Sequence, residues 1–222
     1  MTDDRSSSGL VGRLFRKPGA APAQAAPDSR PEPGGRRVPS KVLPKLLGLL
    51  GHRDHPTILD LGPAVGTNVT FFGERLGCRL IVEDLYTDLD QFARDGRMGE
   101  FGAFLAGRLA HAEHSVDAVL CWDLFDYLDK PSAQALGASL ARLVKPGGAL
   151  FGFFATAAAT DQHYTRFVVV DDTTLEHRAY PGSRTRQLVL LNRDVAMLFP
   201  GLNVSESFLL LAHTREVLFR RP

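Results

Sequence analysis

Long hydrophobic runs, an excess of charge of one sign and a supply of cysteines are all missing from this sequence of 222 residues. No apolar run approaches the ~20 residues that a membrane-spanning helix needs, so we expect no transmembrane segment. Lys and Arg number 26 against 25 Asp and Glu, which gives no reason to expect a nucleic-acid partner. The N-terminus carries Asp3 and Asp4 and lacks the apolar stretch of a signal peptide, so we expect a cytoplasmic protein.

The few cysteines and histidines do not form a metal-binding pattern. Cys78 and Cys121 lie far apart, in or beside expected strands, where reduced and buried thiols are usual. His52 and His55 have a suitable spacing, but they precede the first strand of the expected sheet and would lie at its wrong end. We therefore expect no metal ion.

The first part of the chain differs in composition from the rest. Residues 1–36 are rich in Ala, Pro, Gly, Ser and Arg, and such a stretch cannot bury enough apolar surface to offset its ordering entropy. We expect a disordered basic tail, followed by one domain over residues 37–222. Residues 9–17 (GLVGRLFRK) mix apolar and basic side chains and could make a weak membrane-surface or partner contact, although an ordinary tail explains them as well.

Beyond the tail, short apolar runs alternate with segments of helical spacing. This alternation is typical of βαβ units and predicts an α/β fold, namely a Rossmann-like, doubly wound and mostly parallel sheet with helices on both faces. The expected strands are 57–61, 79–83, 116–121 and 149–154, with a weak one near 104–109, and the expected helices are 40–50, 66–76, most of 87–107 and 132–143.

The C-terminal part has a different pattern. Residues 205–221 form two apolar runs around His213 and Thr214, which predicts an antiparallel hairpin that completes a seven-stranded sheet. Residues 155–200 are the least regular, with one or two strands expected in 166–180 and a helix in 192–201. We interpret 155–200 as an insertion on the substrate side.

Glycines and acids follow the first two expected strands of the sheet. In an open α/β sheet, ligands bind beyond the carboxyl ends of the strands. The first strand runs into ILDLGPAVGTNV (58–69), in which Asp60 precedes a turn formed by Gly62, Ala64 and Gly66. Glycines let the backbone approach a ligand, and the helix that follows offers unpaired N–H groups. The second strand ends at Glu83 and Asp84, and a carboxylate there can accept both hydroxyls of a ribose; Cys121, Trp122 and Asp123 end the strand at 116–121.

These segments carry a resemblance to a known family. ILDLGPAVG, LIVEDLY, SVDAVLCWDLFDYL and LARLVKPGGALFGFF occur in the order found in class I S-adenosylmethionine-dependent methyltransferases, and the resemblance covers roughly residues 40–154. It implies S-adenosylmethionine as cofactor and methyl transfer as the reaction. It also implies that Asp60, Gly62 and Gly66 contact the methionine and ribose portions, that Asp84, or Glu83 instead, binds the ribose hydroxyls, and that Cys121, Trp122 and Asp123 flank the methionine portion and the transferred methyl group.

Two departures from the family pattern leave other functions open. Ala64 replaces the middle glycine, and residues 106–115 hold only Glu113 where the family often has an acid for the adenine amino group. These changes motivate an alternative, a catalytically inactive methyltransferase-like module that binds a partner or the cofactor. A third possibility, a nicotinamide-dependent oxidoreductase, would have Gly-x-Gly-x-x-Gly in the first turn.

The acceptor is expected to be a small molecule, since the chain holds no recognisable nucleic-acid module. Methyl transfer from a sulfonium chiefly requires alignment of the nucleophile with the methyl carbon, and a base is needed only for an acceptor that is protonated. Asp123 is the best-placed base, with His163 or Tyr164 as lesser candidates. Purely structural roles remain open for these residues. Asp60 could cap the turn, Trp122 could lie in the core, and Asp123 could cap a helix. Four arginines could form a solvated face rather than an anion site, namely Arg166, Arg178, Arg184 and Arg186.

Overall fold

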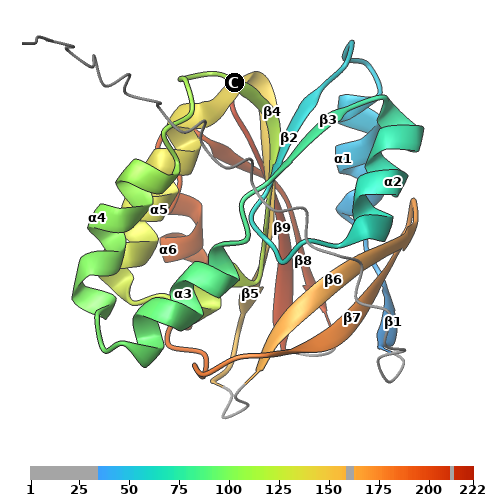
Figure 1. Ribbon diagram of the computed structural model, residues 1–222. Helices are drawn as coiled ribbons and strands as arrows, with labels where there is room; N and C mark the ends of the chain where they lie inside the picture. Colours follow the sequence, from blue (N-terminus) through green and yellow to red (C-terminus); the bar gives the residue numbers. More distant parts are fainter. Residues whose placement is uncertain (1–34, 159–162, 211–212) are drawn as a thin grey trace, which may run out of the picture.

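The computed structural model describes residues 35–158, 163–210 and 213–222 and arranges them in two sheets with flanking helices (Figure 1). Nearly all of the expected tail, including residues 9–17, lies outside the described residues. The larger sheet has six strands in the order β3-β2-β4-β5-β9-β8. The first four are parallel, and β9 and β8 are antiparallel, which confirms the expected α/β fold and its C-terminal hairpin. The strands are β2 (Thr57–Asp60), β3 (Arg79–Val82), β4 (Val116–Trp122), β5 (Val144–Ala155), β8 (Asn203–Leu210) and β9 (Thr214–Arg220).

The expected count of seven strands was wrong, because residues 104–109 do not form a strand. They continue α4 (Met98–Arg108), whose side chains Phe101 and Leu105 are buried. Their spacing of four residues places both on one face of a helix, whereas a strand would bury alternate residues. The stretch expected to be mostly helical over 87–107 is two helices, α3 (Leu85–Arg94) and α4.

Helices cover both faces of the larger sheet and bury two separate apolar clusters. Side chains alternate along a strand, so Leu59 packs into one cluster while its neighbour Ile58 packs into the other. The cluster around Leu59 lies against α3, α4, α5 (Lys130–Leu143) and α6 (Asn192–Met197). The cluster around Ile58 lies against α1 (Leu43–Leu50) and α2 (Gly66–Leu76).

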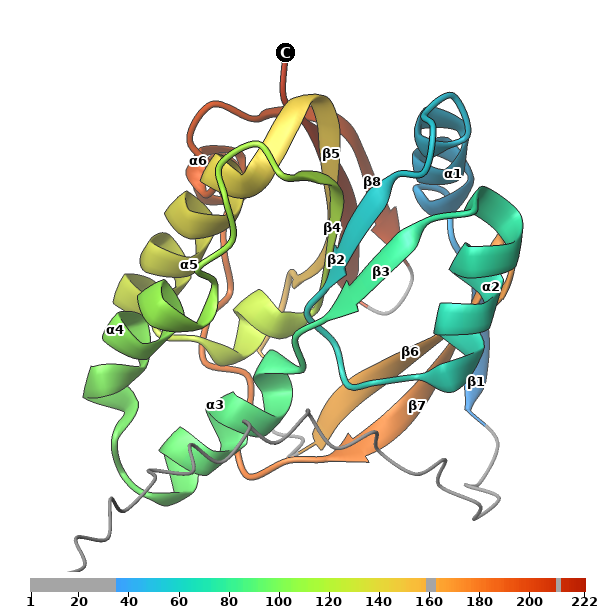
Figure 2. The same ribbon diagram turned by 45° about the horizontal axis from the view of Figure 1, so that its top comes forward.

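A second, three-stranded sheet packs beside α2. It has the order β1-β7-β6, formed by β1 (Arg36–Pro39), β7 (Thr174–Pro181) and β6 (His163–Asp171), all antiparallel. The buried side chain of Asn68 joins it to α2, because its amide donates to the Phe167 carbonyl at 2.9 Å and accepts from the Val169 N–H at 2.8 Å. In Figure 2 the ends of β2 and β3 lie between α3 on one side and the β6–β7 pair on the other. This sheet therefore borders the carboxyl edge where a ligand is expected.

A glycine in α5 sets how closely α5 approaches the chain after α6. A Cβ at Gly137 would lie 2.2 Å from the backbone oxygen of Leu198, so we expect Gly137→Ala to lower the free energy of unfolding by about 2 kcal/mol. Gly102→Ala in α4 is the matched control, because its Cβ would meet only the Ala135 Cβ, at 4.0 Å. Urea denaturation of both variants checks this. A destabilisation by Gly102→Ala as large as that by Gly137→Ala would contradict the packing described, since alanine by itself favours a helix.

Candidate functional site

The carboxyl ends of three strands meet at Asp60. This residue pairs with Val82 of β3 on one side and with Leu120 of β4 on the other. The residues that immediately follow these strands therefore share one edge of the sheet, as expected from the sequence. Asp84, two residues beyond β3, and Trp122, the last residue of β4, have positive φ angles of 26° and 51°. Positive φ is uncommon for residues other than glycine and is often found at functional sites.

Asp60 is buried and already bonded within the protein. It is 2% exposed, and its Oδ1 accepts from the Gly62 N–H at 2.9 Å and from the indole Nε1 of Trp122 at 2.6 Å. Burial raises the pKa of Asp60 to about 6, although the two hydrogen bonds oppose that rise. Asp60 thus caps the turn, and it also joins the ends of β2 and β4.

The glycine loop is covered at one end and open at the other. The indole of Trp122 lies against Gly62, where an added Cβ would meet its Cδ1 at 2.6 Å. Ala64 and Gly66 are exposed, and a Cβ at Gly66 would meet nothing within 4 Å. The methyl group of Ala64 therefore does not crowd the interior of the loop. α2 begins at Gly66 without a side-chain cap, so its first N–H groups are available to a ligand.

The two acids after β3 differ in what they already bind. Glu83 is 7% exposed, forms an ion pair with Arg108, and is bonded to His111 Nε2 at 2.9 Å. Asp84 is half-buried and caps α3, accepting from the N–H and the hydroxyl of Thr87 at 3.2 and 2.9 Å. Burial raises the pKa of Asp84, and the bonds from Thr87 oppose this. Asp84 is therefore the more accessible of the two carboxylates.

Arg108 and His111 are contacts that the sequence reasoning missed. They lie in the stretch 106–115, in which Glu113 is the only acid. The structure directs both side chains to Glu83, and Arg108 also donates to the Glu83 carbonyl at 3.1 Å. A Glu-Asp pair at the end of the second strand is followed by one basic residue at the end of a later helix and another just beyond it, and this pattern could have indicated the pairing.

Asp123 lies at the centre of a buried polar cluster. It is 2% exposed and accepts from the hydroxyl of Tyr86 at 2.6 Å and from that of Tyr127 at 3.3 Å. Burial raises its pKa, and Arg186, 4.0 Å away, partly offsets this. Asp126, next to it and also buried, accepts from the backbone N–H of Ala155. Neither the tyrosines nor Arg186 was connected with Asp123 from the sequence.

Cys121 and Trp122 point into opposite clusters of the core. Cys121 is fully buried in the cluster with Leu59, and burial raises the pKa of its thiol well above the ordinary value. Trp122 belongs to the cluster with Ile58 and reaches back over the glycine loop. Of the two, only Trp122 contacts the loop.

Comparison with known proteins identifies the region that contains this site. Residues 59–152, from β2 through most of β5, match the model of a family described as a methyltransferase domain. Over these residues the chain is similar to a methyltransferase domain. The match includes the glycine loop, Glu83, Asp84 and the end of β4, and it confirms the resemblance to class I S-adenosylmethionine-dependent methyltransferases.

Solved structures that resemble this chain are distant from it in sequence. A 1,6-didemethyltoxoflavin-N1-methyltransferase from Burkholderia thailandensis is 16% identical, with a TM-score of 0.48 over 82% of this chain and 77% of that one. The PH0226 protein of Pyrococcus horikoshii OT3 is 12% identical, with a TM-score of 0.46 over 80% and 87%. The glycopeptide N-methyltransferase MtfA is 19% identical, with a TM-score of 0.46 over 82% and 95%. No curated protein sequence matches the chain.

The remaining candidates around the methyltransferase domain already have contacts within the protein. Tyr164 is buried and donates to Asp90 Oδ1 at 3.2 Å, while His163 is exposed. The four arginines contact different groups and do not form one anion site. Arg166 lies over the ring of Tyr180, and Arg178 pairs with Glu176. Arg184 donates to the Tyr127 carbonyl, and Arg186 lies near Asp123 and Asp126.

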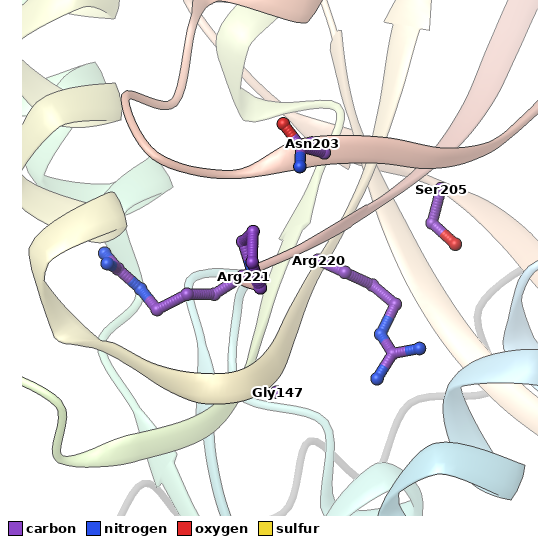
Figure 3. A pocket seen from close by; sticks show the side chains of 6 residues that line it. Gly147, Asn203, Ser205, Arg220 and Arg221 are labelled. Carbon is purple, nitrogen blue, oxygen red and sulfur yellow. The ribbon is translucent and has the colours of Figure 1, made fainter.

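Two cavities in the structure lie away from the glycine loop of the methyltransferase domain. The larger, of about 420 Å³, is lined by Gly147, Asn203, Ser205, Arg220, Arg221 and Pro222, and Figure 3 shows the two arginines pointing in different directions. The smaller, of about 140 Å³, lies between α5 and the segment around α6.

Within the described ranges, no three His, Cys, Asp or Glu side chains gather as metal ligands would. No helix among these residues is long and apolar enough to span a bilayer.

Proposed function

We propose that this protein transfers a methyl group from S-adenosylmethionine to a small-molecule acceptor, with the cofactor bound over the loop 60–66 and beside Asp84. Methyltransferases of the matched family depend on S-adenosylmethionine. The observation that supports this placement most strongly is the position of Asp84. It is a half-buried carboxylate just beyond β3, whose parallel partner β2 ends at Asp60, on the edge of the sheet where ligands of such folds bind.

The residues at this edge fit the ribose end of the cofactor. Gly66 has open space on the side where a Cβ would project, and Asp84 presents an acceptor suited to vicinal hydroxyls. Asp60 is the carboxylate nearest Gly62 and would meet the charged methionine end. The indole of Trp122 lies in the way there.

The bound cofactor would supply an electrophilic methyl group on a sulfonium, and the chain would chiefly hold the acceptor in line with it. Asp123 is already bonded by two tyrosine hydroxyls, so we assign it to orienting Tyr86 and Tyr127 rather than to removing a proton. An acceptor whose nucleophile is unprotonated at working pH needs no base.

The segment that would select the acceptor runs along the same edge. After β7, the Ser183 hydroxyl and N–H bond to Asp90 of α3, at 2.5 and 2.6 Å. Four residues further on, the N–H of Gln187 donates to the Asp126 carbonyl beyond β4, at 2.6 Å. This segment therefore connects α3 with the end of β4, and it lies within the region 155–200 that we interpret as the substrate side.

Two neighbouring acids give a matched test of the cofactor site. Asp84→Asn retains a side chain able to cap α3, but it loses the charge that strengthens bonds from ribose hydroxyls, so we expect affinity for S-adenosylhomocysteine to fall roughly 10- to 100-fold. Glu83→Gln removes half of a buried ion pair, so we expect lower stability with little change in affinity. Calorimetric titration and thermal unfolding of both variants measure the two effects.

The opposite result, in which Glu83→Gln loses the ligand and Asp84→Asn retains it, would move the ribose site to Glu83. Failure of the folded wild type to bind S-adenosylmethionine or S-adenosylhomocysteine would instead reject the proposed cofactor.

A catalytically inactive binding module is the second candidate. The cover that Trp122 forms over Gly62 favours it, because a domain that no longer binds cofactor can fill the space with its own side chains. A folded wild type that binds neither S-adenosylmethionine nor S-adenosylhomocysteine, and that methylates no acceptor with a free amine, hydroxyl or thiol group, would support this module. A cytoplasmic location and the absence of a nucleic-acid partner stay predictions from the sequence.

A further inference from the structure

Trp122 contacts the two groups of the loop that the methionine end of a cofactor would need. Its indole Nε1 donates to Asp60 Oδ1 at 2.6 Å, and its ring edge lies against Gly62. The side chain is 2% exposed, so the indole is packed inside the protein at this end of the loop. A ligand group that lies on Gly62 and bonds Asp60 Oδ1 would need the space and the acceptor that the indole occupies.

The second sheet holds the indole in this position. Trp122 stacks on Phe167 of β6, with ring centres 5.0 Å apart and planes 7° apart, and Phe167 stacks in the same way on Phe153. Asn68 ties the backbone of β6 to the first turns of α2. The positive φ of Trp122 is a strained conformation for a large residue, and such strain persists only where surrounding contacts maintain it.

The other end of the loop is not covered in this way. Ala64 and Gly66 are exposed, and Asp84 is half-buried. A ligand that consists only of the nucleoside could therefore contact Gly66 and Asp84 without moving Trp122. The proposed cofactor site is therefore covered by Trp122 at the end for the methionine portion and open at the end for the nucleoside.

We propose that the indole of Trp122 and the methionine end of the cofactor compete for Gly62 and Asp60, so that Trp122 selects against ligands with a methionine tail until it is displaced. This inference rests on the proposed binding of S-adenosylmethionine. Trp122 would then determine which part of the cofactor binds readily. The strand β6 would hold Trp122 in place through Phe167.

The test compares S-adenosylhomocysteine with 5′-methylthioadenosine, which shares the nucleoside but lacks the amino-acid tail. Trp122→Phe keeps a ring that can stack on Phe167 and removes the N–H that bonds Asp60. We expect it to raise affinity for S-adenosylhomocysteine roughly tenfold, the equivalent of one lost hydrogen bond to a carboxylate, and to leave affinity for 5′-methylthioadenosine unchanged. Calorimetry on the full chain gives both values.

A second readout uses the wild type and does not depend on a variant that folds. Trp122 is the sole tryptophan, so its emission reports its own surroundings. We expect S-adenosylhomocysteine to shift the emission as the indole leaves Gly62, and 5′-methylthioadenosine to leave it unchanged. Tight binding of S-adenosylhomocysteine with unchanged emission, or an equal gain for both ligands in Trp122→Phe, would overturn the inference and leave the proposed function intact. Absence of binding by both ligands, in wild type and variant alike, would overturn both.

Discussion

Replacing Phe167 with alanine is expected to lower the free energy of unfolding by about 3–5 kcal/mol, the usual cost of removing a buried phenylalanine side chain. Phe167 is 4% exposed and lies between two parallel rings, those of Trp122 and Phe153. The alanine would leave a cavity where the second sheet meets the larger one. Urea denaturation at a single pH measures the effect.

The control for this variant is Leu209→Ala on β8, because Leu209 is 74% exposed and its truncation leaves no cavity. Near-equal effects of the two substitutions would mean that the three-stranded sheet is not packed on the domain as described. The variant should also change the emission of Trp122, since it removes one of the rings on which the indole stacks.

Replacing Asp60 with asparagine is expected to remove one pH-dependent contribution to stability. Between about pH 4 and pH 7.5, the free energy of unfolding of the variant should rise by about 3 kcal/mol relative to that of the wild type. The folded protein raises the pKa of Asp60 from 3.8 to about 6, chiefly through burial. The proton is therefore bound more tightly in the folded state. The associated stability is fully present below pH 3.8 and is lost as the pH rises through 6.

Asparagine cannot ionise, so the variant avoids this loss, while its amide oxygen can still accept from Gly62 and Trp122. The measurement is the difference in unfolding free energy between variant and wild type at several pH values, in which groups that titrate alike in both proteins cancel. A difference that stays constant with pH would show that Asp60 has an ordinary pKa and would contradict the burial described.

Much of the larger sheet follows directly from the sequence, because its strands are short apolar runs between segments of helical period. The helix over Gly66–Leu76 was predicted with its observed bounds, and the hairpin of β8 and β9 was predicted as well. The second sheet was harder, since β1 pairs with a strand about 140 residues later in the chain. Pairing over such a distance leaves no periodic signal in either segment. The weak strand expected near 104–109 was wrong, because this stretch continues the helix in which Phe101 and Leu105 share one buried face.

The candidate site was predictable in position but not in its contacts. The ends of β2, β3 and β4 could be located from sequence, and the structure brings Asp60, Asp84 and Trp122 to one edge. Which acid remains accessible could not be predicted, because the partners of Glu83 come from a later helix and the loop after it. The contact between Trp122 and Gly62 depends on a positive φ and on Phe167, neither of which a linear pattern indicates.

A crystal structure of the protein with S-adenosylhomocysteine would show directly whether the cofactor binds at this edge of the sheet. We expect the ribose hydroxyls on Asp84, the methionine end at Asp60 and Gly62, and the indole of Trp122 moved away from Gly62. The ligand bound at another edge of the sheet, or crystals grown with saturating ligand that contain none while Trp122 still covers Gly62, would contradict this expectation.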